Sequence, residues 1–138
     1  ALALIGIHEY LRRFEGDRHA NQVLDELAGR LLTLYTNCRS REWCWFEDGL
    51  TYCNAALPQA LLMCGQWIPD KAMTDAGLES LRWLAEMQRA NATGGHFVSI
   101  GSNGFYQRGG ERARFDQQPV EAQTMASACL EAFSLPFS

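Results

Sequence analysis

The segment from Gly49 to Pro69 is twenty-one residues long and contains no charged side chain. It does not read as a membrane span, which takes about 20 predominantly apolar residues, because Asn54, Pro58, Gln59 and Gln66 interrupt it. A helix that is apolar on all sides must be covered on all sides. The segment therefore predicts a buried helix inside a larger helical fold.

Uncharged and amphipathic helices alternate along the chain. In the amphipathic helices, leucines recur every three or four residues opposite charged side chains. A simple bundle would make every helix amphipathic, so the alternation predicts an all-α fold in two layers, with the uncharged helices forming the more buried inner layer. The expected inner helices cover about 1–14, whose first seven residues carry no charge, 54–66, which has no charge, and 119–133, whose only charges are Glu121 and Glu131. The expected amphipathic helices cover about 18–37 and 70–89.

A long connection over 91–118 holds six of the twelve glycines. Within it, two apolar runs at 97–100 and 105–107 flank Asn103-Gly104, a strong hairpin-turn signal. The pattern predicts a short β-hairpin that projects from one end of the helices. Long loops of this kind often bind ligands.

Composition excludes several classes of partner. The formal charge is −4, Lys71 is the only lysine, and no cluster of basic residues is present to neutralise phosphates, so a nucleic-acid partner is not expected. The five cysteines are odd in number and the three histidines share no ligand spacing, so we expect no metal and no other cofactor. Free thiols in a cytoplasmic protein, without a membrane partner, are the simplest interpretation.

Two clusters combine aromatic, acidic and amide side chains. Residues 43–48 read Trp-Cys-Trp-Phe-Glu-Asp, and residues 115–121 read Phe-Asp-Gln-Gln-Pro-Val-Glu. Each cluster precedes or opens an expected uncharged helix. Aromatic faces pack on the apolar faces of sugar rings, while carboxylates bind hydroxyls or transfer protons. Their equivalent positions predict a carbohydrate-facing funnel.

Four segments resemble the six-hairpin, glycosidase-like α/α toroid domain, in particular versions in bacterial proteins labelled as, or attached to, glycosyltransferases. They cover residues 45–47, 51–61, 77–84 and 115–122. The resemblance implies twelve helices in six hairpins, with a substrate funnel at the rim where the inner helices begin. Because this chain supplies about five helices, we expect residues 1–138 to form a single domain that is a fragment of a larger toroid, with uncovered helix faces that favour self-association.

The candidate catalytic carboxylates are Glu47, Asp116 and Glu121. One acid from each cluster would suit an inverting glycosidase, whose carboxyl groups lie roughly 6.5–9.5 Å apart. Structural roles remain open for several candidates, since acids favour helix N-termini and Asn54, Asp116 or Gln118 would also serve as caps. The candidate substrate-binding residues are Trp45, Asp48, Tyr52, Asn54, Gln59, His96, Gln117 and Gln118.

Three functions fit these features. The chain is part of a glycoside-active enzyme, a non-catalytic carbohydrate-binding domain accessory to a glycosyltransferase, or a non-catalytic helical scaffold whose clusters only cap helices. In the first two, the acids and Trp45 line one concave face with a carbohydrate ligand. In the third, they point apart.

Overall fold

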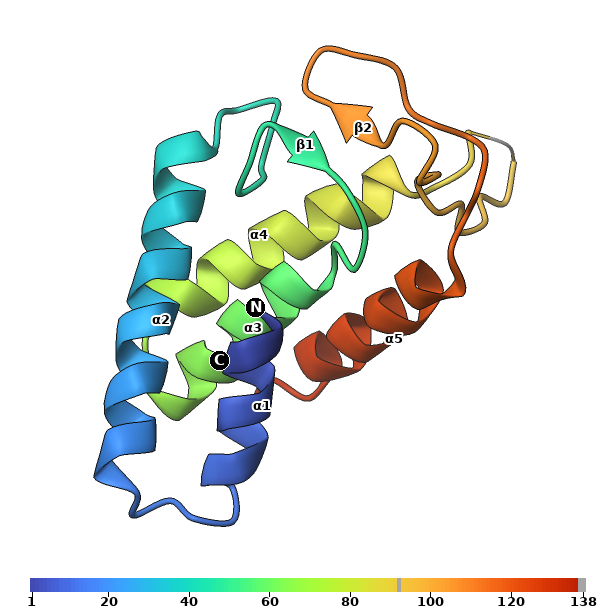
Figure 1. Cartoon of the computed structure of the whole chain (residues 1–138). Helices are drawn as coiled ribbons and strands as arrows, with labels where there is room; N and C mark the ends of the chain where they lie inside the picture. The colour runs from blue at the N-terminus through green and yellow to red at the C-terminus, as the bar shows by residue number, and fades with distance from the viewer. Residues whose placement is uncertain (92, 137–138) are drawn as a thin grey trace.

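The computed structural model describes residues 1–91 and 93–136, and in that part of the chain it contains five α-helices and two short β-strands (Figure 1). The predicted all-α fold is confirmed. No helix in these residues is both long and apolar enough to cross a membrane. The elements are α1 (Leu2–Leu11), α2 (Arg18–Cys38), β1 (Gly49–Leu50), α3 (Ala56–Trp67), α4 (Lys71–Met87), β2 (Tyr106–Gln107) and α5 (Pro119–Phe133).

Helix α3 lies at the centre of the molecule. It packs against each of the other four described helices, whereas α1 and α5 do not contact one another (Figure 1). Eight of its twelve residues are buried, among them Leu61, Leu62 and Cys64. The prediction of a helix covered on all sides is therefore confirmed. It begins at Ala56, two residues later than expected.

Taken together, helices α1 and α5 are not more buried than α2 and α4, and that part of the layer prediction is wrong. In α1 only Leu4 and Leu11 are buried. In α5, Leu130 is 70 % exposed and Phe133 is 81 % exposed. Each of these helices packs against only two others, and α5 contains four alanines, whose small side chains have little apolar area to bury.

The closest helix pair, α3 and α4, is brought together by glycine. A Cβ atom on Gly65 would lie 2.5 Å from the Thr74 hydroxyl oxygen and 2.9 Å from the Thr74 backbone nitrogen. A Cβ on Gly77 would lie 2.9 Å from the Leu62 side chain. The absent side chains let the two backbones approach to a distance that any larger residue would prevent.

The predicted hairpin within 91–118 does not form as expected. Strand β2 lies in this segment, but its antiparallel partner is β1, with Gly49 opposite Gln107 and Leu50 opposite Tyr106. The run at 97–100 turns instead to the end of α4, where Val98 N donates to Gln88 O at 2.7 Å. A turn signal reports local chain reversal, whereas the strand partner is chosen by long-range packing.

Candidate functional site

The segments that precede α3 and α5 meet at one end of the molecule. Strand β1, just before α3, pairs with β2, and Arg108 N donates to Asp48 O at 2.8 Å. Figure 1 shows the two strands and their loops at the end where α2 and α4 finish and α3 and α5 begin. We call this end the rim. It unites the two sequence clusters, which are about seventy residues apart.

A buried polar junction fixes the base of the rim. Asn54 Nδ2 donates to Glu121 Oε2 at 2.9 Å, and Gln88 Nε2 donates to the same oxygen at 3.1 Å. These three side chains come from the segment before α3, the end of α4 and the first turn of α5. Glu121 is 1 % exposed. Its Oε2 is held by two amide groups of the protein, so this oxygen is not available to exchange a proton with a substrate.

Asn54 is likewise a buried organiser of the chain and not an exposed sugar-binding group. Its Oδ1 accepts from Thr51 N at 2.9 Å, and its Nδ2 also donates to Thr51 O at 3.1 Å. The side chain therefore closes the turn that leads into α3. The residue at the N-cap position of that helix is Ala55, so Asn54 is not the N-cap.

Trp45 belongs to the core, which overturns its assignment as a sugar-stacking residue. It is 0 % exposed and lies against Trp83 at a ring-centroid distance of 5.8 Å. Trp43 is also buried, packs edge-on to Trp83 at 4.8 Å, and donates from Nε1 to Glu47 O at 2.7 Å. The indoles bury large apolar areas against one another, so neither offers a free face to a ligand.

The two acids of the first cluster are both exposed. Asp48 pairs with Arg108 at 3.3 Å, and that arginine also donates to Cys38 O and Ser40 Oγ. Asp48 thus helps join the loop after α2 to the loop after β2. Burial, followed by the nearby Asp48 charge, raises the pKa of the Cys38 thiol, so this cysteine is not an activated nucleophile.

The second cluster lies on the surface. Phe115 is 75 % exposed, and Asp116, Gln117 and Gln118 are exposed as well. Gln117 Oε1 accepts from Ser99 Oγ at 3.1 Å. Gln118 is at the N-cap position of α5 but makes no capping hydrogen bond through its side chain. Most polar tips of this cluster therefore face the solvent at the rim.

Exposed aromatic surface adjoins the second cluster. Tyr52 is 61 % exposed and stacks on Phe105 with ring centroids 6.3 Å apart and an interplanar angle of 23°. Phe105 N donates to Gly101 O. Ser102, which follows Gly101, donates from its backbone N to Asp116 O at 3.0 Å. One short loop therefore connects Tyr52 to the Phe115–Gln118 segment.

Three residues of the rim have a positive backbone φ, in the left-handed region that residues other than glycine rarely adopt. Cys53 and Phe105 have φ of 54°, and Asp116 has φ of 57°. Such strain persists only where the surrounding structure imposes it, and it often accompanies binding sites. Pro69, between α3 and α4, also has a positive φ, of 30°, so strained backbone is not confined to the rim.

Gln59 and His96 lie outside this group. Gln59 is half-buried within α3. His96 is exposed in the loop after α4, where its carbonyl oxygen accepts from Ala90 N at 2.9 Å. This bond holds His96 to the end of α4 and not to the segment that leads into α5.

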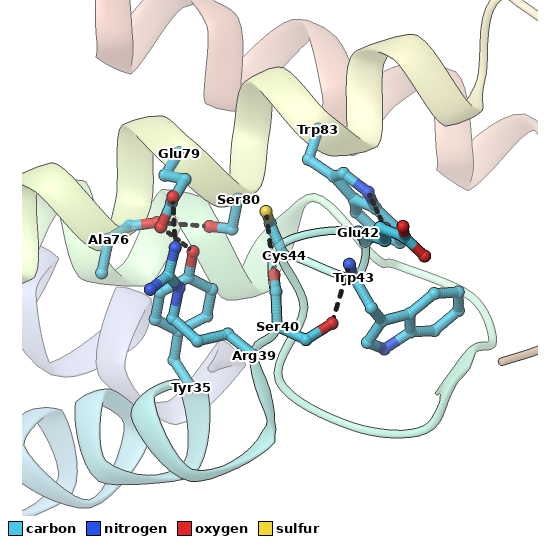
Figure 2. A network of polar contacts seen from close by, with 10 residues as sticks. All are labelled: Tyr35, Arg39, Ser40, Glu42, Trp43, Cys44, Ala76, Glu79, Ser80 and Trp83. Carbon is cyan, nitrogen blue, oxygen red and sulfur yellow. Dashed lines mark hydrogen bonds and ion pairs between the residues drawn. The ribbon is translucent and has the colours of Figure 1, made fainter.

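A second polar site, between α2 and α4, was not predicted from the sequence. Tyr35 and Arg39 reach from α2 to Glu79 on α4 (Figure 2), where the Tyr35 hydroxyl donates to Glu79 and Arg39 pairs with it at 2.5 Å. They form one wall of a groove of about 750 Å³. The spacing of Tyr35 and Arg39 by one helical turn was the available signal.

The chemistry of this second site is structural. Burial, reinforced by the hydrogen bond to Glu79, raises the pKa of Tyr35 above its ordinary value. The phenol therefore stays neutral near pH 7 and acts as a hydrogen-bond donor. Together the three side chains clamp α2 to α4.

Within residues 1–91 and 93–136, no group of three or more His, Cys, Asp or Glu side chains is placed to hold a metal ion. Comparison with protein-family models, curated proteins and solved structures finds no match to this chain. The resemblance to six-hairpin toroids therefore stays a prediction based on four sequence segments.

Proposed function

We propose that the five helices are part of an α/α toroid that binds carbohydrate at its rim. The contact pattern supports this architecture. Helices α1, α3 and α5 form one row with α3 in the middle. Helix α2 touches both α1 and α3, and α4 touches both α3 and α5. Each helix of the second row thus bridges two neighbours of the first, as in a ring of helical hairpins.

The observation that carries the proposal is the exposed aromatic and polar surface at the rim. Tyr52, supported by Phe105, offers a flat apolar face to solvent, and the amides and carboxyl group of Asp116–Gln118 lie on the same loop assembly. A sugar ring presents an apolar face and a circle of hydroxyls, which requires this pairing of an aromatic plane with nearby acceptors and donors.

Binding is favoured over hydrolysis as the activity of these residues. Of the three candidate catalytic carboxylates, Glu121 is engaged in the buried junction, which leaves Glu47 and Asp116 on the surface. General acids and bases are tuned by burial or by neighbouring charge, and exposed carboxyl groups lack the first of these influences. The accessory carbohydrate-binding function therefore ranks above a glycoside hydrolase.

Titration calorimetry with methyl α-glucoside, methyl α-mannoside, methyl β-galactoside and their disaccharides tests the proposal. We expect Tyr52→Ala and Asp116→Asn to weaken binding about five- to thirtyfold, because each removes roughly 1–2 kcal/mol of interaction. Tyr10→Ala and Asp75→Asn are matched controls, since both residues are exposed on other helices. Equal losses in the controls, or no binding to any sugar, would contradict a carbohydrate site at the rim.

A non-catalytic interaction domain is the second candidate. It is favoured by one observation, the exposure of Leu130 and Phe133 on α5. Contiguous exposed apolar side chains often mark protein interfaces. Two measurements separate the candidates. A carbohydrate-binding domain binds sugar, whereas an interaction domain associates with a protein partner or with itself and binds no sugar.

A further inference from the structure

Two buried oxygen atoms at the base of the rim have no hydrogen-bond donor in the described part of the chain. They are Glu121 Oε1 and Gln88 Oε1. Both residues are 1 % exposed. A buried acceptor without a donor loses its interaction with water and gains nothing in return, which is why native proteins leave few of them.

The two oxygens belong to one site, because their side chains are bonded to each other. Gln88 Nε2 donates to Glu121 Oε2, and this bond sets the orientation of the amide. A flipped amide would place its oxygen against the carboxyl oxygen, where two acceptors repel. The nearby amide of Asn54 is already engaged, since its nitrogen donates to Glu121 and its oxygen accepts from Thr51 N.

The unfilled groups are therefore both acceptors, and their missing partner is a donor. We propose that Glu121 Oε1 and Gln88 Oε1 bind an O–H donor that is not part of the chain. One source is an internal water molecule, which can donate two hydrogen bonds to such a pair. The other is a hydroxyl group of the sugar, and this second source rests on the carbohydrate-binding function proposed above.

The position of the site connects it with the rim. Glu121 follows the exposed Gln118 by three residues, and its backbone N–H donates to Gln118 O at 3.1 Å. Asn54 follows the exposed Tyr52 by two residues. A donor bound here would thus contact residues two or three positions along the chain from the exposed aromatic and amide side chains.

The variant Glu121→Gln replaces one carboxyl oxygen by an NH₂ group and leaves the shape of the side chain almost unchanged. One carbonyl oxygen remains to accept from Asn54 and Gln88, while the other oxygen becomes an NH₂ group that can no longer accept. Thr124→Val is the matched control. Thr124 is buried on the same helix, and its hydroxyl bonds only to Val120 O and Glu121 O.

Crystal structures of the unaltered chain, alone and soaked with the methyl glycosides named above, test the proposal directly. We expect ordered density within about 3.2 Å of both oxygens. In the sugar complex, we expect Glu121→Gln to weaken binding at least about tenfold and Thr124→Val to leave it unchanged.

The outcomes separate this site from the function of the rim. Water density without binding of any sugar would support the donor site and contradict the carbohydrate function. Sugar binding that Glu121→Gln does not weaken, together with an empty site in the free crystal, would overturn the donor site and leave the carbohydrate function standing. The crystallographic result needs no variant, so it decides even if Glu121→Gln fails to fold.

Discussion

At the scale of single residues, Tyr35 illustrates how one hydroxyl joins two helices. It is buried on α2 and donates to Glu79 on α4, which also accepts from Arg39. Ionisation of the phenol would place a negative charge beside the Glu79 carboxylate in a desolvated position. Desolvation, followed by this hydrogen bond, therefore raises the pKa of Tyr35 in the folded protein.

This raised pKa predicts a pH dependence of stability. Below about pH 10 the phenol is neutral in both states, and its contribution is fully present. Above that pH the unfolded state releases the proton first, so the free energy of unfolding falls by up to about 1.4 kcal/mol per pH unit. Urea unfolding of the original chain and of Tyr35→Phe should show a difference in stability that shrinks above about pH 10. A difference that stays constant would contradict the assignment.

At the scale of elements, the crossing of α3 and α4 depends on the absence of a side chain at Gly65. A Cβ there would meet the Thr74 backbone as well as its hydroxyl, and a backbone cannot move aside as a flexible side chain can. A Cβ atom on Gly29, in α2, would meet no other atom within 4 Å. The two glycines therefore have the same helical preference but opposite surroundings.

We predict opposite effects of alanine at these positions. Gly29→Ala should raise the free energy of unfolding by up to about 1 kcal/mol, because alanine loses less backbone entropy in a helix. Gly65→Ala should lower it by about 1–2 kcal/mol, since overpacking outweighs that gain. Chemical denaturation measures both. Stabilisation by Gly65→Ala would show that α3 and α4 can separate at little cost.

At the scale of the whole molecule, α1 and α5 both pack on α3 without contacting one another, and both carry exposed apolar side chains. Leu2 on α1 is exposed, as are Leu130 and Phe133 on α5. Each such side chain gains roughly 1.5–3 kcal/mol on full burial. Association through these helices would bury surface that the single chain leaves in water.

We predict that the chain self-associates through α5 as its concentration rises. Phe133→Glu should shift the equilibrium toward monomer by at least about tenfold, because a charge then enters the apolar contact. Phe115→Glu is the control, since Phe115 is similarly exposed but lies at the rim. Light scattering at several concentrations measures the mass. A monomer at all concentrations, or equal effects of both variants, would contradict association through α5.

The sequence alone was sufficient to predict the helices. The leucine spacing of α2 and α4, the uncharged run of α3, and Pro119 at the start of α5 are local signals, and each corresponds to a helix with similar bounds. They are readable because helical periodicity and helix-start preferences act over a few residues. The burial of α3 was also predictable, since none of its residues carries a charge.

Only the tertiary structure decided which candidate side chains are accessible. Trp45 and Tyr52 are both aromatic residues before the same helix, yet Trp45 packs on Trp83 in the core while Tyr52 stacks on Phe105 at the surface. Their partners lie far away along the chain. The same holds for Glu121, whose burial depends on amides from two other segments. Residue type fixes what a side chain can do chemically, whereas long-range packing determines whether a ligand can reach it.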